Sequence, residues 1–229
     1  NLFPSSPIIV FSRWFPYNKR LEQSFLLEEL KILSIQFEKV YLVPQFIEGN
    51  PYDSSNELFL VDSSLTSRLK NISLISKFKA LCSLHLLFEI PNTGFSIKKI
   101  KRAYSSLLAS FVINEWLNNF LRDKSDVVLY SFWLDQSSLA SSITKNPAIV
   151  KVVSRCHNYD LYGNESNGYY VPFRKKVINN LDTVLPDSHQ GKSFLLNHYP
   201  KANIQIGLMG TKHCEIKNEL SKDNVIRLI

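Results

Sequence analysis

Short, almost continuously apolar runs alternate along this chain with longer segments that have the apolar spacing of helices. The runs predicted as strands are residues 8–11, 40–43, 127–132, 149–154, 183–185 and 204–206. The segments predicted as helices are residues 22–36, 136–144, 173–180 and 190–198. Strands that are apolar on both faces need cover on both faces, which is typical of a parallel sheet. We therefore expect an α/β fold: a Rossmann-like, doubly wound, mostly parallel sheet with helices on both faces.

The part of the chain between the second and third predicted strands has a different pattern. Residues 45–64 are polar and show no period, whereas residues 65–124 favour two or three amphipathic helices. The sequence Pro-Asn-Thr-Gly at residues 91–94 interrupts these helices. We expect this helical insertion to belong to one domain of residues 1–211.

The net charge of the chain is concentrated in the insertion. Residues 65–124 hold ten Lys and Arg and three acidic residues, an excess of seven that equals the net charge of +7 of the whole chain. A general nucleic-acid binder spreads its basic residues more widely, so we expect no nucleic-acid partner. Two interpretations stay open: an ordinary solvated helical face, or a face that docks on anionic lipid. The second combines Phe78, Leu81, Leu84, Phe88 and Phe95 with Lys77, Lys79, Lys98, Lys99, Lys101 and Arg102.

Several motifs that would indicate a common function are absent from the sequence. The triplet Gly-Lys-Ser at residues 191–193 resembles the end of a phosphate-binding loop, but Pro186 stands where that loop requires a glycine. No G-x-G-x-x-G fingerprint follows the first predicted strand, and no His or Cys residues have the spacing of metal ligands. We therefore expect neither a dehydrogenase nor a P-loop NTPase, and no metal. Three widely spaced cysteines fit a reducing compartment, and no clean apolar run reaches the roughly 18 residues of a membrane span.

In a parallel sheet, the functional residues lie at the carboxyl ends of the strands. This rule selects four loops: residues 12–20, 131–135, 155–162 and 186–190. The third loop is the densest in chemically active side chains, with Arg155, His157, Asn158 and Asp160. An imidazole titrates near neutral pH and can orient or deprotonate a hydroxyl. The alternative is that His157 is a packed or surface histidine.

This loop and the residues after it resemble bacterial family 4 glycosyltransferases of the GT-B fold. The main match is Ser-Arg-Cys-His-Asn-Tyr-Asp at residues 154–160, followed by Gly-Tyr-Tyr-Val-Pro-Phe-Arg at residues 168–174. Weaker matches are a serine-x-x-glycine segment before a helix (185–195), a leucine-glycine loop (208–211), and the first loop and helix (15–30). The resemblance is good over residues 127–211, fair over residues 8–44, and absent over residues 45–124.

The resemblance implies the amino-terminal, acceptor-side half of a retaining glycosyltransferase. It makes residues 212–229 a linker and the start of a donor-binding domain that lies outside this chain. Such an enzyme moves a sugar from a nucleotide-diphosphate-sugar donor to a saccharide or lipid-linked acceptor, in the synthesis of bacterial surface polysaccharide or lipopolysaccharide. It implies no cofactor and no metal. The resemblance makes His157 the catalytic candidate, near the reacting sugar. The candidates for substrate binding are Arg155, Asn158, Asp160, Arg174, Tyr17, Trp133, Ser188 and Gly210.

Alternatives to these roles stay open. The charged candidates can instead form a structural salt-bridge network, and the aromatic ones can instead be part of the core. Two departures from the family pattern concern Asn158, where a glycine is usual, and Arg13-Trp14, which replace the glycine pair of the first loop. We expect the chain alone to be inactive and located in the cytoplasm or at the inner face of the cytoplasmic membrane. The alternative function is a non-catalytic Rossmann-like module that binds a saccharide or a protein.

Overall fold

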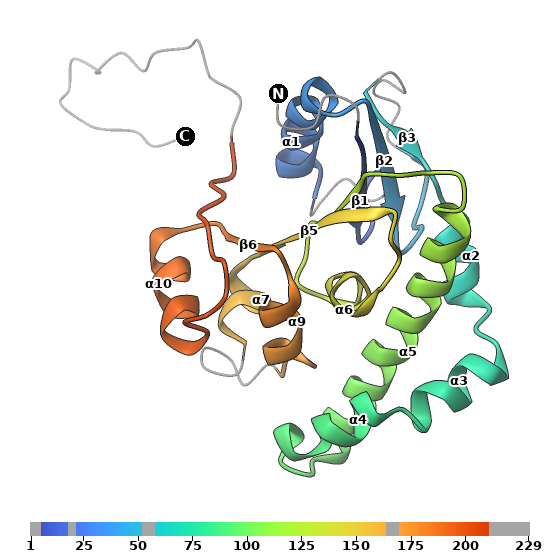
Figure 1. The fold of residues 1–229 in the computed structure, drawn as a ribbon, viewed down its shortest axis with the longest axis vertical. Coiled ribbons are helices and arrows are strands. Elements are labelled where there is room, and N and C mark those ends of the chain that lie inside the picture. The colour runs from blue at the N-terminus through green and yellow to red at the C-terminus, as the bar shows by residue number, and fades with distance from the viewer. Residues whose placement is uncertain (1–5, 18–21, 52–57, 164–169, 211–229) are drawn as a thin grey trace, which may run out of the picture.

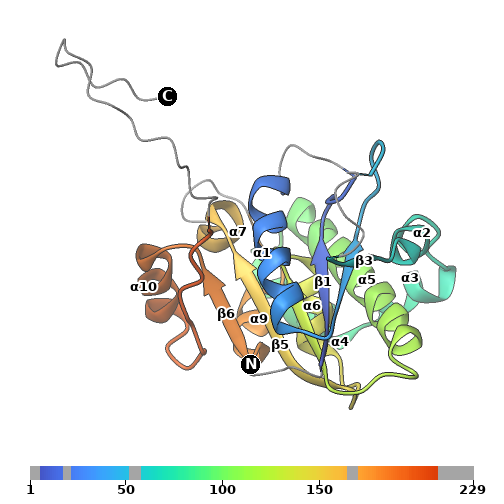
Figure 2. The same cartoon turned by 90° about the horizontal axis from the view of Figure 1, so that it is seen from above.

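The computed structural model describes residues 6–17, 22–51, 58–163 and 170–210 (Figure 1). These residues form a six-stranded sheet of order β3-β2-β1-β4-β5-β6, and each pair of neighbouring strands is parallel. The strands are β1 (Pro7–Ser12), β2 (Lys39–Pro44), β3 (Leu60–Val61), β4 (Val127–Ser131), β5 (Ile149–Cys156) and β6 (Thr183–Pro186). Figure 2 shows the sheet from above, with β3 at one edge and β6 at the other. The prediction of a Rossmann-like parallel α/β fold is confirmed.

Helices cover both faces of the sheet. On one face lies α1 (Gln23–Gln36), and on the other lie α5 (Ile97–Phe120), α6 (Gln136–Ile143) and α9 (Arg174–Asn180) (Figure 1). The remaining helices are α2 (Ser64–Lys70), α3 (Leu74–Leu81), α4 (Leu84–Glu89), the 3₁₀ helix η1 (Ile90–Thr93), α7 (Asn158–Tyr162) and α10 (His189–His198).

The central strand β1 supplies the core on both faces, because successive side chains of a strand point to opposite sides. Ile8 and Val10 pack with α1. Ile9 and Phe11 belong to the core on the α5 side, where the ring centroids of Phe11 and Trp116 lie 6.0 Å apart. Since both sets are apolar, the strand reads as a continuous apolar run, which is the pattern that predicted it.

The long helix α5 joins the insertion to this core. It packs closely on α6, whose buried face consists mostly of small side chains: Ser137, Ser138, Ala140 and Ser141. Small residues at a helix contact shorten the distance between the two axes. The indole N–H of Trp116 also donates to Ser64 Oγ at 2.8 Å, which connects α5 to α2.

The prediction of two or three helices in the insertion is wrong. Residues 64–120 contain four α-helices and η1, because two serines begin new helices inside an apolar stretch. Ser73 Oγ accepts from the backbone N–H of Ser76 at the start of α3, and Ser83 Oγ accepts from that of His85 at the start of α4. Serine at this position satisfies a free N–H group of the first turn and favours a helix start.

Three short elements also differ from the prediction. β3 lies in the predicted polar loop, and α7 lies in the loop after β5. These elements have two and five residues, which is too short for a period to be read. The strand predicted at residues 204–206 is a single bridge between Ile204 and Val184. The predicted linker at residues 212–229 lies outside the described residues.

Candidate functional site

A cavity of about 310 Å³ opens at the carboxyl edge of the sheet. Arg13 comes from the loop after β1, Asp135 from the loop after β4, Tyr159 and Asp160 from α7, and Arg102 from α5. The order of the strands reverses between β1 and β4, and crevices at such a point are where ligands bind in open α/β sheets. Described residues from three of the predicted loops, 12–20, 131–135 and 155–162, therefore do meet at one place.

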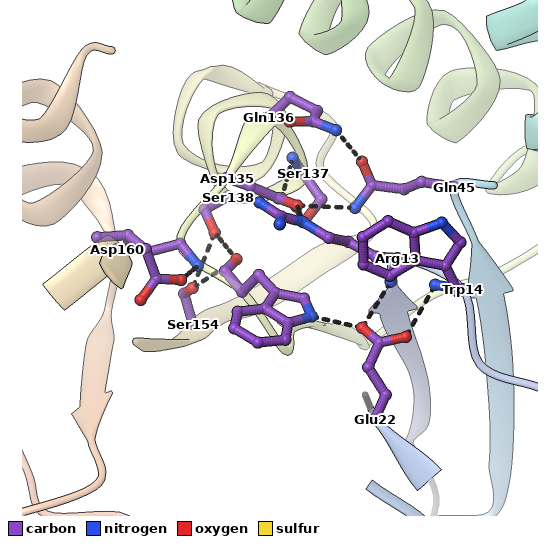
Figure 3. Close-up of polar contacts among 12 residues, drawn as sticks. Arg13, Trp14, Glu22, Gln45, Asp135, Gln136, Ser137, Ser138, Ser154 and Asp160 are labelled. Carbon is purple, nitrogen blue, oxygen red and sulfur yellow. Dashed lines mark hydrogen bonds and ion pairs between the residues drawn. The ribbon is translucent and has the colours of Figure 1, made fainter. Parts of the chain in front are cut away.

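Asp135 connects three of the segments around this cavity (Figure 3). Its carboxylate accepts from Arg13 Nε at 3.2 Å and from Gln45 Nε2 at 3.1 Å. The same carboxylate caps α6 by accepting from the backbone N–H of Ser137 at 2.9 Å and from its hydroxyl at 2.7 Å. The Gln136 side chain donates to Gln45 Oε1 at 2.6 Å, which closes the network. The rim of the cavity is thus fixed before any ligand binds.

The guanidinium of Arg13 lies among three aromatic rings. Its central carbon is 5.8 Å from the ring centroid of Trp14, 5.2 Å from that of Trp133 and 5.1 Å from that of Tyr159. Burial works against its charge, but the neighbouring Asp135 and Tyr159 raise the pKa of Arg13 above its usual value. Arg13 therefore presents a permanent positive charge to the cavity.

Arg102 faces the same cavity from α5. Burial, together with the positive charge of Arg13, lowers its pKa from the usual value. Two guanidinium groups at one cavity favour a ligand rich in acceptor oxygens, because a guanidinium only donates hydrogen bonds.

Glu22 organises the loop after β1, and the sequence did not reveal this role. Its buried carboxylate accepts from three successive backbone N–H groups, those of Arg13 at 2.9 Å, Trp14 at 2.8 Å and Phe15 at 2.7 Å. It also accepts from the indole N–H of Trp133 (Figure 3). The only signal in the sequence is an acidic residue at the first position of a predicted helix (residues 22–36), shortly after a predicted strand.

His157 is buried beside the cavity and is 8% exposed. Its ring centroid lies 4.9 Å from that of Phe132 and 4.5 Å from that of Trp133. The ring is turned toward the start of α7, yet neither ring nitrogen reaches hydrogen-bond geometry with another described residue. Burial, with the positive charges of Arg155 and Arg13, lowers the pKa of His157 to about 4. The imidazole is therefore neutral at physiological pH.

Asp160 is buried on the wall of the cavity. Its carboxylate accepts from the backbone N–H of His157 and, at 2.9 Å, from that of Leu134. Burial raises the pKa of Asp160 to about 7, although the two N–H groups favour the charged form. This carboxyl group therefore changes its charge well above the pH range of an exposed aspartate.

Arg155 lies on the other side of the sheet, toward α1. Its guanidinium binds the Glu29 carboxylate at 2.9 to 3.0 Å and the Tyr130 hydroxyl at 2.7 Å, and it donates to the carbonyl of Gly207. These contacts tie α1, β4, β5 and the segment around Gly207 together. They correspond to the structural salt-bridge interpretation that the sequence left open.

Arg174 lies in a second cavity of about 230 Å³, lined by residues that include Glu89 and Tyr170. Its guanidinium is 5.6 Å from the ring centroid of Phe194. Within the described ranges its Nε and Nη2 atoms are buried without a hydrogen-bond partner. The structure therefore does not bring Arg174 together with His157.

The other predicted candidates lie around this edge in ordinary surroundings. Asn158 is exposed at the first position of α7, and Tyr17 is half-buried after a turn closed by its N–H to the Trp14 carbonyl at 2.7 Å. Ser188 caps α10 by accepting from the N–H of Gly191 at 3.1 Å. Gly210 is exposed at the end of the described chain.

Comparisons with known proteins do not assign this site. The chain matches no model of a known protein family, and it matches none of the curated proteins. Among the described residues, no group of three or more His, Cys, Asp or Glu side chains is placed to hold a metal ion.

Proposed function

We propose that this chain is the acceptor-side half of a retaining, metal-independent glycosyltransferase that uses a nucleotide-sugar donor. The observation that carries the proposal is the group of polar side chains at the carboxyl edge of the sheet. There Arg13, Arg102, Asp135 and Asp160 line one cavity, and the backbone N–H of His157 donates to Asp160. Carboxylates and guanidinium groups together supply acceptors and donors for the hydroxyls of a sugar. The resemblance of residues 154–174 to family 4 glycosyltransferases supplies the reaction class.

In this proposal the acceptor saccharide occupies the cavity, whose volume is at the lower end of the range for small-molecule sites. His157 acts as a neutral imidazole that positions a reacting hydroxyl, because its pKa of about 4 leaves it uncharged at neutral pH. Both of its ring nitrogens are buried, and the ring of Trp133 contacts those of His157 and Tyr159. In this proposal the side chain of Trp133 moves aside when the acceptor binds, while the network around Asp135 stays in place.

The proposal is tested with the full-length protein and a panel of nucleotide-diphosphate sugars. Thermal shift selects the donor, and release of nucleoside diphosphate in the presence of candidate acceptors measures turnover. We expect His157→Ala to lower the turnover of the folded protein by about 100-fold, beyond any loss of stability that follows from removing a buried ring. The matched control is His198→Ala, which removes an exposed histidine on α10. An unchanged rate in His157→Ala, with any active donor, rejects the role of His157.

One observation favours the second candidate function, a non-catalytic saccharide-binding module. The resemblance implies that the loop after β1 contacts the phosphates of the donor. In this chain three backbone N–H groups of that loop already donate to Glu22. Saccharide binding measured by calorimetry, without nucleotide release from any donor in the panel, would support this module. It would also reject the proposed transferase.

A further inference from the structure

Helices α3 and α4, η1 and the start of α5 expose an unusual number of large apolar side chains. Nine such residues are between 59% and 80% exposed. They are Leu74, Ile75, Phe78, Leu81, Leu84, Leu87, Phe88, Phe95 and Ile97, which we call the apolar face. Exposed apolar residues scattered singly are normal, but so many on consecutive elements mark an interaction surface. In Figure 1 these elements lie at the lower edge of the molecule, beyond α5.

The apolar face is not the result of loose packing, because the helices are anchored through other side chains. The buried residues of α3 are the small Ser76 and Ala80, four positions apart on the side toward α5. At the end of α4, the buried Glu89 accepts from the Tyr170 hydroxyl at 2.6 Å and from the backbone N–H of Phe173 at 2.8 Å. Small and acidic residues, together with the buried Leu86 of α4, thus face inward, while the nine residues of the apolar face point to solvent.

Phe95 adds a second, independent observation. It follows Gly94, and both residues have left-handed backbone conformations, with φ of 58° at Phe95 and 59° at Gly94. For a bulky L-residue this conformation costs roughly 1–2 kcal/mol. The ring gains no compensating burial, since it is 73% exposed. Backbone strain of this kind concentrates at functional positions, and here it holds an aromatic ring out into solvent.

The exposed charged residues on the same elements are all positive. Lys77, Lys79, Lys98 and Lys101 are exposed there. Between residues 74 and 102 the one acidic residue is Glu89, which is buried and already accepts hydrogen bonds. A second copy of this chain would place like charges against each other, whereas a surface of phosphate groups would neutralise them.

We propose that the apolar face docks on the surface of an anionic lipid bilayer. Phe78, Phe88 and Phe95 enter the boundary between headgroups and acyl chains, and the surrounding lysines bind the lipid phosphates. None of the described helices is long and apolar enough to cross a membrane. The inference goes beyond the proposed function and stands without it.

The docked orientation has a consequence for the cavity at the carboxyl edge of the sheet. Arg102 and Ser105 on α5, and Ile72 in the turn between α2 and α3, line that cavity. The same turn leads into the apolar face, and α5 begins in it. A ligand attached to a lipid would therefore reach the cavity along the docked surface.

The test is co-sedimentation of the chain with vesicles of phosphatidylcholine, alone or in an equimolar mixture with phosphatidylglycerol. We expect binding to the mixed vesicles at low salt, a steep decrease as salt is added, and little binding to pure phosphatidylcholine. Replacing Lys77, Lys79, Lys98 and Lys101 with Gln is expected to weaken binding to mixed vesicles by on the order of 100-fold. The triple substitution Phe78→Ser, Phe88→Ser and Phe95→Ser is expected to have an effect of similar size.

Matched controls lie elsewhere on the surface. Lys145→Gln with Lys201→Gln removes two exposed lysines outside the insertion, and Ile32→Ser with Ile35→Ser removes two exposed apolar residues of α1. Circular dichroism establishes that each variant is folded. The proposal is overturned by equal binding to neutral vesicles, by no binding at low salt, or by equal loss in the controls. It is also overturned if the triple Phe substitution abolishes a dimer in solution and leaves vesicle binding unchanged.

Discussion

Two buried residues of one turn, His157 and Asp160, oppose each other in how pH affects stability. The pKa of His157 falls from 6.5 to about 4 on folding. The contribution of His157 to the free energy of unfolding is therefore present above pH 6.5 and is lost as pH falls toward about 4. The pKa of Asp160 rises from 3.8 to about 7 because the carboxyl is buried. The contribution of Asp160 to the free energy of unfolding is therefore present below pH 3.8 and is lost as pH rises through about 7.

Single substitutions separate the two effects. Relative to the wild type, the unfolding free energy of His157→Gln is expected to rise by on the order of 3 kcal/mol as pH falls from 6.5 to about 4. That of Asp160→Asn is expected to rise as pH increases from 3.8 to about 7. Urea unfolding at a series of pH values measures both, with the exposed His198→Gln as the control. Parallel pH profiles for the wild type and both variants would disprove the assignment.

At the scale of elements, α10 approaches α7 closely at Gly191. A Cβ atom at this position would lie 2.6 Å from Leu161 Cδ2, and Leu161 is fully buried. The sequence around Gly191 resembled a phosphate-binding loop, but the structure gives the glycine a packing role. The reason is that α10 can rest on α7 only where no side chain stands between them.

We therefore expect Gly191→Ala to destabilise the protein by roughly 1–3 kcal/mol, the usual cost of overfilling a packed contact. The control is Gly94→Ala, because a Cβ there meets nothing within 4 Å, so any cost comes from its φ of +59° alone. Thermal unfolding of the two variants compares these costs. A melting temperature of Gly191→Ala equal to that of the wild type would contradict the prediction. It would show that α7 can shift to make room for the methyl group without loss of stability.

The candidate site shows why sequence proximity is a partial guide to function. Arg155 and Asp160 are five positions apart and were predicted to act together. Arg155 is still in β5, where alternate side chains point to opposite faces, so its guanidinium meets Glu29 on the α1 side. Asp160 has entered α7 and faces the cavity. No pattern in the sequence announced a helix of five residues, so this division could not be predicted.

At the scale of the whole molecule, the alternation of strands and helices was predictable because parallel strands are apolar on both faces. The role of Glu22 was not, since it depends on a turn that aims three N–H groups at one point. The surface of the insertion could be predicted in part. Its net charge was visible in the sequence, and so were five of the nine side chains of the apolar face, namely Phe78, Leu81, Leu84, Phe88 and Phe95. The fold was needed to add the other four and to separate all nine from buried neighbours such as Leu86.

The insertion and the sheet share one hydrophobic core, which affects how the molecule is expected to unfold. Trp116 on α5 is buried in the same core as β1 and β4, whereas Trp133 lies at the carboxyl edge of the sheet beside His157. Because one core includes both the insertion and the sheet, the two regions should unfold in a single cooperative transition.

Variants that keep one tryptophan each, with the others replaced by Phe, test this directly. For each variant, we expect the urea midpoint from tryptophan fluorescence to equal that from far-UV circular dichroism, whichever tryptophan is kept. The two midpoints are compared within each variant, so any destabilisation caused by the Trp→Phe replacements affects both equally. If Trp116 reported a lower midpoint than circular dichroism, the insertion would be a separate folding unit. The apolar face would then be able to rearrange on a membrane without disturbing the sheet.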